Sequence, residues 1–391
     1  MRILFTFVGG SGHFEPLVPI ARAAEAAGHT VVFAGQPVMI PAIEAAGFTA
    51  LATAGATLRG TPERLPLLKV DLEREYRDLR EGFARRLART RAEAILALCA
   101  AWNPDLLVCD EIDFGAMIAA ERRGVPYASV LVIAAGSFVR KDVVGEPLQQ
   151  VRAAYGLPPD PDLEMLSRYL VLSPFPPSYR DPAFPLPPTA HSIRPLALDN
   201  ARAAEAPPWF AGLPDMPLVY FTLGTVFNVE SGDLFERMLA GLRDLPVQVI
   251  ATVGRELDPA EFGPQPDTIR IERYVPQAAI LPHCAAVVSH GGSGSVIGAL
   301  AHGLPSVLVP MGADQPLNAL RCADLGVAQV LDAVAATPDS VRAAVTTVLE
   351  EPSYRRAAER MRDEIAALPG AAHALMLLER LAAERRPILA A

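Results

Sequence analysis

The stretch "VVSHGGSGSVIGALAHG", residues 287–303, has the composition of an anion-binding turn. An apolar strand is predicted to end at His290, and a helix is predicted to begin near Ser293. The first backbone N–H groups of a helix, at the positive end of its dipole, favour an anion. No Asp, Glu, Lys or Arg occurs between Tyr274 and Ala313, so no carboxylate of this stretch repels one, although burial alone also produces such a run. We expect a phosphate site built from glycines, serines and a histidine: Gly291, Gly292, Gly294, Ser293, Ser295 and His290.

A second glycine-rich stretch, "GGSGHFEP" at residues 9–16, follows the apolar opening "MRILFTFV" and carries His13. It fits a phosphate loop, a catalytic site, or a plain turn with a structural histidine. Asp110 ends the apolar run "DLLVCD", and sites in parallel sheets gather at the carboxyl ends of strands. Asp110 is therefore the natural partner of His13, with Asp113 as an alternative. Either aspartate fits a cap or turn role equally well.

The elements that must position these residues alternate between strand and helix. Buried strands are predicted at 2–8, 31–35, 104–110 and 126–133, and helices at 15–27, 39–48, 91–102 and 114–124. The pattern restarts with strands at 218–225, 247–254, 269–275, 285–290 and 305–310, a helix at 234–245 and a last helix at 371–385. Helical excursions are expected at 55–90, and loops with short helices at the proline-rich residues 140–190.

This alternation predicts an α/β protein made of two doubly wound, Rossmann-like domains facing a central cleft. The predicted boundaries are a first Rossmann-like domain at 1–198, a linker at 199–216 and a second Rossmann-like domain at 217–370. A C-terminal helix at 371–391 is expected to pack back towards the first domain. Ligands commonly bind between such halves.

Composition excludes several classes of protein. The chain has 391 residues, a net charge of −9 and 51% hydrophobic residues. The acidic balance argues against a general nucleic-acid binder. No uninterrupted apolar segment is long enough for a membrane span, so no integral membrane association is expected. The spacing of the four cysteines fits neither a zinc site nor a CxxC pair, which predicts buried, reduced thiols and a cytoplasmic protein.

The order and spacing of four motifs resemble the nucleotide-sugar signature of glycosyltransferase family 1. These motifs are "VPQ" at 275–277, "HGGSGS" at 290–295, G-x-P at 303–305 and "PMGADQPLNA" at 310–319. More narrowly, they resemble the bacterial macrolide and antibiotic branch, which has the GT-B fold, and the likeness covers essentially the whole chain. The resemblance implies an inverting, metal-independent transferase that moves a sugar from a nucleoside diphosphate to a hydroxyl of a lipophilic natural product. It implies no cofactor beyond this co-substrate, and oligomeric state is not indicated.

The resemblance implies that the domain at 1–198 binds the acceptor and that the domain at 217–370 binds the nucleotide sugar. It also assigns donor-binding roles. Tyr274, Val275 and Gln277 would contact the base or ribose, and Asp314 and Gln315 the sugar hydroxyls, although Asp314 also fits a helix N-cap. The diphosphate would lie against the glycine-rich turns and their hydroxyls: Gly12, Thr225, His290, Gly292, Ser293, Gly294 and Ser295.

One position departs from the family pattern. Relatives that use UDP-glucose often carry a glutamate eight residues after the motif histidine, where it grips the ribose diol. Gly298 stands there and cannot make this contact. A 2′-deoxyribose donor does not need the 2′-hydroxyl half of it, so a dTDP-sugar is favoured over a UDP-sugar.

In this family the histidine of a "G-x-G-H-x-x-P" setting is the general base, which assigns that role to His13 with Asp110 behind it. The acceptor is expected among loops 55–90 and 136–180, near Phe14, Met117 and Phe138, although each of these fits a core residue as well. No metal site is expected. The D-x-D at Asp160–Asp162 lies in a proline-rich stretch and is typical of a turn.

Three alternatives remain open at this point. A dinucleotide oxidoreductase is disfavoured, because Glu15 or Phe14 replaces the third glycine of G-x-G-x-x-G and the strand "VVFAG" ends without an acidic residue. Another GT-B enzyme, either a nucleotide-sugar epimerase or a lipid-linked sugar transferase, is the second. A non-catalytic, glycosyltransferase-like partner protein is the third.

Overall fold

The structure is a computed structural model that describes residues 1–53, 64–195 and 207–390. Parts of the expected loop 55–90 and of the expected linker 199–216 lie outside the described residues. The chain divides into two compact units. The first, unit 1, contains Met1–Leu58, Glu73–Leu196 and Leu368–Ala391; the second, unit 2, contains Arg59–Leu72 and Ala197–Ala367.

Unit 1 is built on a parallel sheet with the strand order β3-β2-β1-β4-β5-β6-β7. Its strands are β1 (Arg2–Thr6), β2 (Thr30–Gly35), β3 (Thr49–Ala52), β4 (Leu106–Asp110), β5 (Tyr127–Val130), β6 (Leu170–Ser173) and β7 (Ala190–Ser192). The central strands β1 and β4 are paired from Ile3–Leu106 to Thr6–Cys109. The chain leaves both strands at the same edge of the sheet, which brings the loops after them together.

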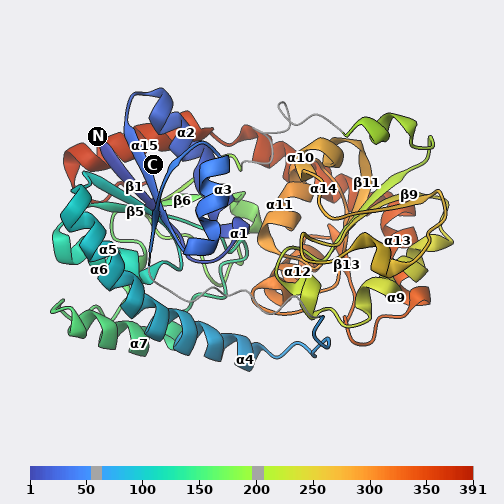
Figure 1. Cartoon of the computed structure of the whole chain (residues 1–391), viewed down its shortest axis with the longest axis horizontal. Coiled ribbons are helices and arrows are strands. Elements are labelled where there is room, and N and C mark those ends of the chain that lie inside the picture. Colours follow the sequence, from blue (N-terminus) through green and yellow to red (C-terminus); the bar gives the residue numbers. More distant parts are fainter. Residues whose placement is uncertain (54–63, 196–206, 391) are drawn as a thin grey trace. The chain divides into compact units, whose positions relative to one another are not determined.

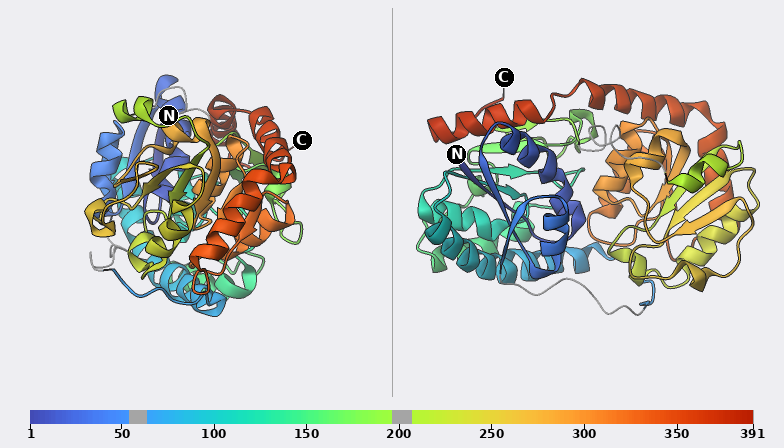
Figure 2. Two further views of the ribbon diagram at one scale, coloured as in Figure 1. Left: turned by 90° about the vertical axis from the view of Figure 1, so that its right-hand side faces the viewer. Right: turned by 45° about the horizontal axis from the view of Figure 1, so that its top comes forward.

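Helices cover both faces of this sheet (Figure 1). On one face lie α2 (Val18–Ala26), α3 (Ile40–Ala45) and the C-terminal α15 (Ala371–Glu384), whose leucines join the core formed by Ile3 and Phe5. Figure 2 shows α15, in red, along this unit. On the other face lie α5 (Ala88–Trp102), α6 (Phe114–Arg123) and α7 (Lys141–Ala154). The short α4 (Leu72–Arg77) and the π-helix η3 (Asp78–Leu87) lead into α5.

Unit 2 repeats the design with the strand order β10-β9-β8-β11-β12-β13. Its strands are β8 (Leu218–Thr222), β9 (Gln248–Thr252), β10 (Ile269–Glu272), β11 (Cys284–Ser289), β12 (Ser306–Leu308) and β13 (Ala328–Val330). Its helices are α9 (Leu234–Arg243), α10 (Gln277–Ile280), α11 (Ser293–Ala301), α12 (Gln315–Asp324), α13 (Pro338–Glu350) and α14 (Pro352–Ala367). All the pairings in both sheets are parallel, which confirms the predicted α/β class.

The structure differs from the sequence prediction in two regions. The proline-rich residues 140–190 contain the 14-residue helix α7, which accommodates Pro147, and the short strand β6. The segment around Leu65 groups with unit 2, where the Leu65 N–H donates to the Val229 carbonyl at 2.6 Å and the Gly232 N–H donates to the Leu65 carbonyl at 3.1 Å.

The remaining sequence expectations concern thiols, turns and membrane spans. The four cysteines are buried thiols, as predicted. Asp160 accepts from the backbone N–H groups of Glu164 and Met165, at 2.9 and 2.8 Å, which confirms its turn role. Within the described ranges no single helix is long and apolar enough to cross a membrane; the bent pair α14 and α15 passes only when the two are taken together.

Candidate functional site

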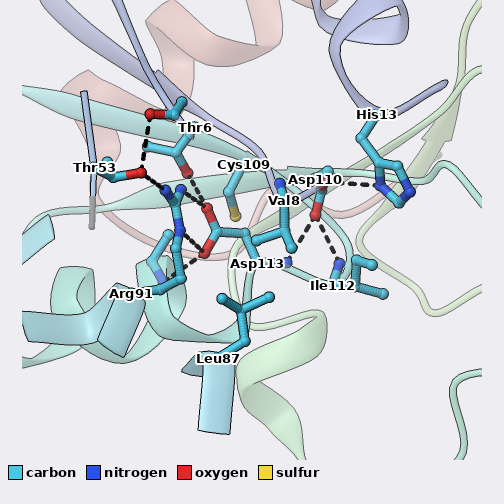
Figure 3. A network of polar contacts seen from close by, with 12 residues as sticks. Thr6, Val8, His13, Thr53, Leu87, Arg91, Cys109, Asp110, Ile112 and Asp113 are labelled. Atoms are coloured by element: carbon cyan, nitrogen blue, oxygen red, sulfur yellow. Dashed lines mark hydrogen bonds and ion pairs between the residues drawn. The ribbon is translucent and has the colours of Figure 1, made fainter. Parts of the chain in front are cut away.

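His13 and Asp110 are in direct contact in unit 1. The Nδ1 atom of His13 lies 3.0 Å from Oδ2 of Asp110 (Figure 3). The Asp110 side chain is fully buried at the end of β4, whereas the His13 side chain is 26% exposed. One ring nitrogen therefore faces a buried carboxylate, and that contact fixes which nitrogen carries the proton.

Asp110 is held in place by backbone N–H groups. Its Oδ2 atom accepts from Val8 at 2.9 Å, and its Oδ1 atom accepts from Ile112 at 2.9 Å and Asp113 at 2.7 Å. A buried carboxylate needs such donors, since burial without them is strongly unfavourable. Asp110 is therefore both the turn residue that the sequence allowed and the partner of His13.

His13 reaches this position because of the turn before it. After β1 the chain turns through Gly9, whose φ of +107° is left-handed, and α1 (Ser11–Phe14) begins two residues later. A Cβ atom built on Gly9 would lie 2.9 Å from Cδ2 of His13, so glycine is needed both for the backbone and for the space. Gly12 in the same turn is exposed, with nothing near its missing side chain.

Asp113, the alternative partner of His13, is occupied elsewhere. Its Oδ1 atom accepts from Arg91 Nε at 3.2 Å and from the Ala116 N–H at 3.2 Å, where it caps α6. Its Oδ2 atom accepts from the Thr6 hydroxyl at 2.8 Å and from Arg91 Nη2. The structure thus assigns Asp113 to Arg91, and the contact with His13 to Asp110.

In unit 2 the glycine-rich turn presents the start of α11. Gly291 has a left-handed φ of +82°, and Gly292 is the N-cap in extended conformation. No side chain caps the helix, and its first turn contains no acidic residue. Gly294 is exposed and Ser295 is half-buried. The start of this nine-residue helix is thus uncapped by side chains, as an anion site requires, and anion binding there stays a prediction.

The His290 ring lies close to Gly292 of this turn and to Gly224 of the loop after β8. Cβ atoms built on Gly224 and Gly292 would lie 2.6 and 2.5 Å from its Nε2 atom, so larger residues there would displace the ring. Burial lowers the pKa of His290 from 6.5 to about 4, against a smaller opposing effect of the Thr222 carbonyl. His290 is therefore neutral near pH 7 and can still donate one N–H.

Asp314 does not cap α12, although it stands at the N-cap position. Its Oδ2 atom instead accepts from the Ser293 hydroxyl at 2.7 Å and from Asn318 Nδ2 at 2.8 Å. Asn318 is fully buried and also donates to the Gly291 carbonyl at 3.1 Å. Ala313, just before, has a left-handed φ of +51°, a strained conformation of the kind found at functional sites.

This cluster corrects one expectation and shows other partners for two side chains that were expected to contact the donor. The stretch from Tyr274 to Ala313 contains no acidic residue, but the fold brings the carboxylate of Asp314 to Ser293, the first residue of α11. The Ser293 hydroxyl, expected at the diphosphate, is used to orient Asp314. Gln315 is 2% exposed, and its Oε1 atom accepts from the Met311 N–H at 2.9 Å, so in this structure it stabilises the loop rather than facing a sugar.

The residues expected near the nucleoside lie on other loops of unit 2. Tyr274 is 50% exposed with the Arg255 guanidinium 4.6 Å from its ring centre, and both line a pocket of about 570 Å³. Val275 is buried, so only its backbone could reach a ligand. Thr225 is exposed in the loop after β8. Gln277 begins α10, and its Oε1 atom would lie 3.4 Å from a Cβ on Gly298.

All three side chains that were expected to contact the acceptor are buried. Phe14 is 5% exposed and packs on Phe7 and Phe33, with ring centres 5.4 and 5.2 Å apart, and Met117 in α6 is fully buried. Both assignments were wrong because apolar residues next to a motif also complete the core beneath it. Phe138 is 7% exposed and packs on Tyr76 at 5.7 Å.

Two residues of these networks were missed from the sequence. Asn318 lies inside the quoted "PLNA", which was a usable signal. Arg91 lies in "ARRLARTRAEA", where nothing distinguishes the buried arginine from its exposed neighbours.

Comparisons with known proteins agree with this geometry. A family model described as "Erythromycin biosynthesis protein CIII-like, C-terminal domain" matches residues 236–381. The chain is 30% identical to the 3-alpha-mycarosylerythronolide B desosaminyl transferase of Saccharopolyspora erythraea over 99% of both chains. It is 30% identical to the tylactone mycaminosyltransferase of Streptomyces fradiae over 99% of this chain and 93% of the relative. It also matches the crystal structure of the glycosyltransferase VinC in complex with dTDP, with 27% identity, a TM-score of 0.75 and coverage of 98% and 100%.

His290 is expected to stay neutral down to about pH 5. Because its folded pKa of about 4 lies below the ordinary 6.5, its contribution to stability is present above pH 6.5 and is lost as the pH falls towards 4. Ring nitrogen shifts in ¹⁵N-histidine NMR should therefore be constant from pH 8 to 5. A His290 ring that titrates near pH 6.5 in the folded protein would contradict this.

Proposed function

The chain belongs to the bacterial antibiotic glycosyltransferases of the GT-B fold, and we propose that it transfers a sugar from a nucleoside diphosphate to a hydroxyl of a lipophilic natural product. It is a glycosyltransferase; the donor, the acceptor and the mechanism are proposals. The observation that carries the mechanism is the 3.0 Å contact between His13 Nδ1 and the buried carboxylate of Asp110.

In this mechanism His13 is the general base. With Nδ1–H donated to Asp110, the Nε2 atom keeps its lone pair and accepts the proton of the acceptor hydroxyl. Asp110 then stabilises the imidazolium that forms, as in other histidine–carboxylate pairs. The hydroxyl attacks the anomeric carbon opposite the departing diphosphate, so the configuration is inverted.

The leaving diphosphate gains negative charge, which the start of α11 is suited to stabilise. The uncapped N–H groups, the Ser295 hydroxyl and a neutral His290 that donates one N–H all offer hydrogen bonds without a formal charge. Asp314, oriented by Ser293 and Asn318, is the proposed contact to the sugar hydroxyls. Transfer without a metal or cofactor, and a cytoplasmic location, are also proposals; the four buried thiols support the location.

The base assignment is tested by His13→Ala. We expect the transfer rate to fall roughly 10²- to 10⁴-fold, because one positioned base contributes about that much. Binding of dTDP should be unchanged. The measurement is product formation by mass spectrometry, with dTDP- and UDP-sugars against phenolic and macrolide acceptors, with and without EDTA.

A matched control is His29→Ala, since His29 also faces a carboxylate, with Nε2 2.8 Å from Glu379 Oε1, but on the side of unit 1 where α15 lies. A His13→Ala variant as active as this control would refute the base assignment. Release of the sugar without an acceptor would favour an epimerase, transfer only to lipid-linked acceptors would favour a lipid-linked sugar transferase, and no turnover of any donor would favour a non-catalytic partner.

The role of Ser293 separates the two interpretations of the donor site. If its hydroxyl orients Asp314, Ser293→Ala should lower kcat/KM for the sugar donor about 10-fold but leave dTDP affinity within about 3-fold. Ser295→Ala, the matched control, should weaken dTDP binding. Calorimetry with dTDP and initial rates with the sugar donor measure the two effects. If Ser293→Ala instead loses affinity for dTDP, the result would favour the sequence-based assignment of the Ser293 hydroxyl to the diphosphate.

The expected preference for dTDP over UDP rests on Gly298, which stands where relatives carry a carboxylate that contacts the ribose. We expect dTDP to bind more tightly than UDP, and Gly298→Glu to narrow the difference about 10-fold by offering a carboxylate to the ribose hydroxyls. Gly298→Ala is the control, because a Cβ there makes only 3.4 Å contacts with Gln277 and Leu281. Calorimetric titration that shows tighter UDP binding by the unsubstituted protein would reverse the donor preference.

A further inference from the structure

A buried ion pair lies directly behind the His13–Asp110 contact, on residues that the proposed chemistry does not use. Arg91 and Asp113 are both fully buried, and Arg91 is among the largest fully buried side chains of the described residues. The guanidinium meets both carboxylate oxygens of Asp113, through Nε and Nη2, and its Nη1 atom donates to the Thr53 hydroxyl. Figure 3 shows these groups and the His13–Asp110 contact in one view.

The ion pair is connected to Asp110 through the backbone. The N–H of Asp113 donates to Asp110 Oδ1 at 2.7 Å, so the residue that Arg91 fixes is itself a donor to the carboxylate behind His13. The Thr6 hydroxyl ties Asp113 to the end of β1, and Val8, two residues on, donates to Asp110 Oδ2. Three segments thus converge on the two aspartates, and a shift of Asp113 would be passed to Asp110.

The helices that carry the pair approach each other closely at a glycine. A Cβ atom built on Gly115 of α6 would lie 2.5 Å from the Ala88 carbonyl and 2.5 Å from Arg91 Cβ of α5. The backbones of α5 and α6 therefore touch at this glycine, beside the ion pair. Arg91 thus reaches Asp113 beside a close contact between α5 and α6.

The charges add an electrostatic link. The two buried carboxylates, three residues apart in sequence, carry like charges, and Arg91 is the cation that offsets them. The thiol of Cys109, the residue before Asp110, responds to the same charges: burial and both aspartates raise its pKa well above the usual value, whereas Arg91 lowers it. A change in this balance should reach the imidazole that Asp110 contacts.

We propose that Arg91 and Asp113 are positioning residues for the proposed transfer reaction, with Arg91 fixing the turn that presents Asp110 and the pair's balanced charge setting the basicity of His13. The proposal rests on the proposed function for the role of His13. Its two parts, geometry and charge, make separable predictions.

Other ionisable groups near the His13–Asp110 contact must be accounted for. Burial raises the pKa of Glu111 to about 7, against the opposing effects of the Val132 and Ile133 N–H groups and Arg180. Desolvation lowers the pKa of Arg180, and burial raises that of Glu15. The Cys109 thiol stays neutral in the working range. Because Glu111 titrates near neutrality, the experiments are done in both the unsubstituted and the Glu111→Gln background.

The charge part is tested by the NMR titration midpoint of the His13 ring in the substrate-free full chain. Asp113→Asn keeps the cap on α6 but leaves the Arg91 charge unbalanced, so the midpoint should fall by about half a unit to one unit. Arg91→Met should move it up by a similar amount, and the double variant should return it to the unsubstituted value. If Arg91→Met does not fold, Asp113→Asn and the double variant decide.

The geometry part is tested by Arg91→Lys, which keeps the charge but cannot make the two-pronged contact with Asp113. The His13 midpoint should stay within about 0.2 units, while kcat should fall roughly 10- to 100-fold with KM for the donor unchanged, because the defect is one of placement. Asp110→Asn removes the carboxylate that contacts His13, so it should give the largest change in both the His13 midpoint and kcat.

The outcomes are distinct. An unmoved His13 midpoint in folded Asp113→Asn, or a double variant that does not restore it, would overturn the charge part. A normal kcat in Arg91→Lys would overturn the geometry part. The NMR measurement needs no turnover, so it stands even if His13→Ala were to refute the proposed base.

Discussion

The site in unit 1 depends on one constraint, which is that the carboxylate of Asp110 is buried. An ionised carboxylate removed from water is stable only if its oxygens are hydrogen-bonded and its charge is balanced. Three backbone N–H groups and the His13 ring meet the first requirement. Asp113 supplies one of those N–H groups and carries a second buried carboxylate, whose charge is balanced by the ion pair with Arg91. The turn at Gly9, the close helix contact at Gly115 and the placement of His13 all follow from satisfying these two groups.

In unit 2 the corresponding constraint concerns the N–H groups at the start of a helix. The anion site proposed there requires that the start of α11 stays uncapped, and a helix end without partners is unfavourable unless a ligand or water supplies them. Nearby polar groups are accordingly used elsewhere. The Ser293 hydroxyl is turned to Asp314, and the side chain of Asp314 is drawn away from capping α12. Both α11 and α12 therefore lack a side-chain N-cap, a contact that typically contributes about 1 kcal/mol to stability. A binding site at the start of α11 would explain this loss.

The sequence predicted those parts that depend on pattern. Apolar runs of strand length, broken by helical periodicity, predicted most strands of both sheets. His13 and Asp110 could be paired because His13 follows one parallel strand and Asp110 ends another. What it could not predict depends on partners distant in sequence. Nothing in "ARRLARTRAEA" marks Arg91 as buried, because its partners Asp113 and Thr53 are selected by the packing of α5. Phe14 and Met117 failed for the converse reason, since the residues that complete the core and those that line a ligand site are drawn from the same apolar set. Strand β7, with three residues, is too short to give an alternation signal.

The two units thus balance charge in opposite ways, and the chemistry proposed for each accounts for the difference. A general base must gain a proton during the reaction, so a buried negative charge behind it is useful, provided that a cation balances the second buried carboxylate. Removing one partner of a buried ion pair costs about 3–5 kcal/mol of stability, because the other charge is left uncompensated. A diphosphate arrives already charged and leaves more so, and a buried cation would hold the product as well as the transition state. Neutral donors with fixed geometry, such as the first N–H groups of α11 and an uncharged His290, stabilise developing charge without that penalty. The low pKa of His290, set by burial, keeps the ring neutral across the physiological range and so maintains this arrangement.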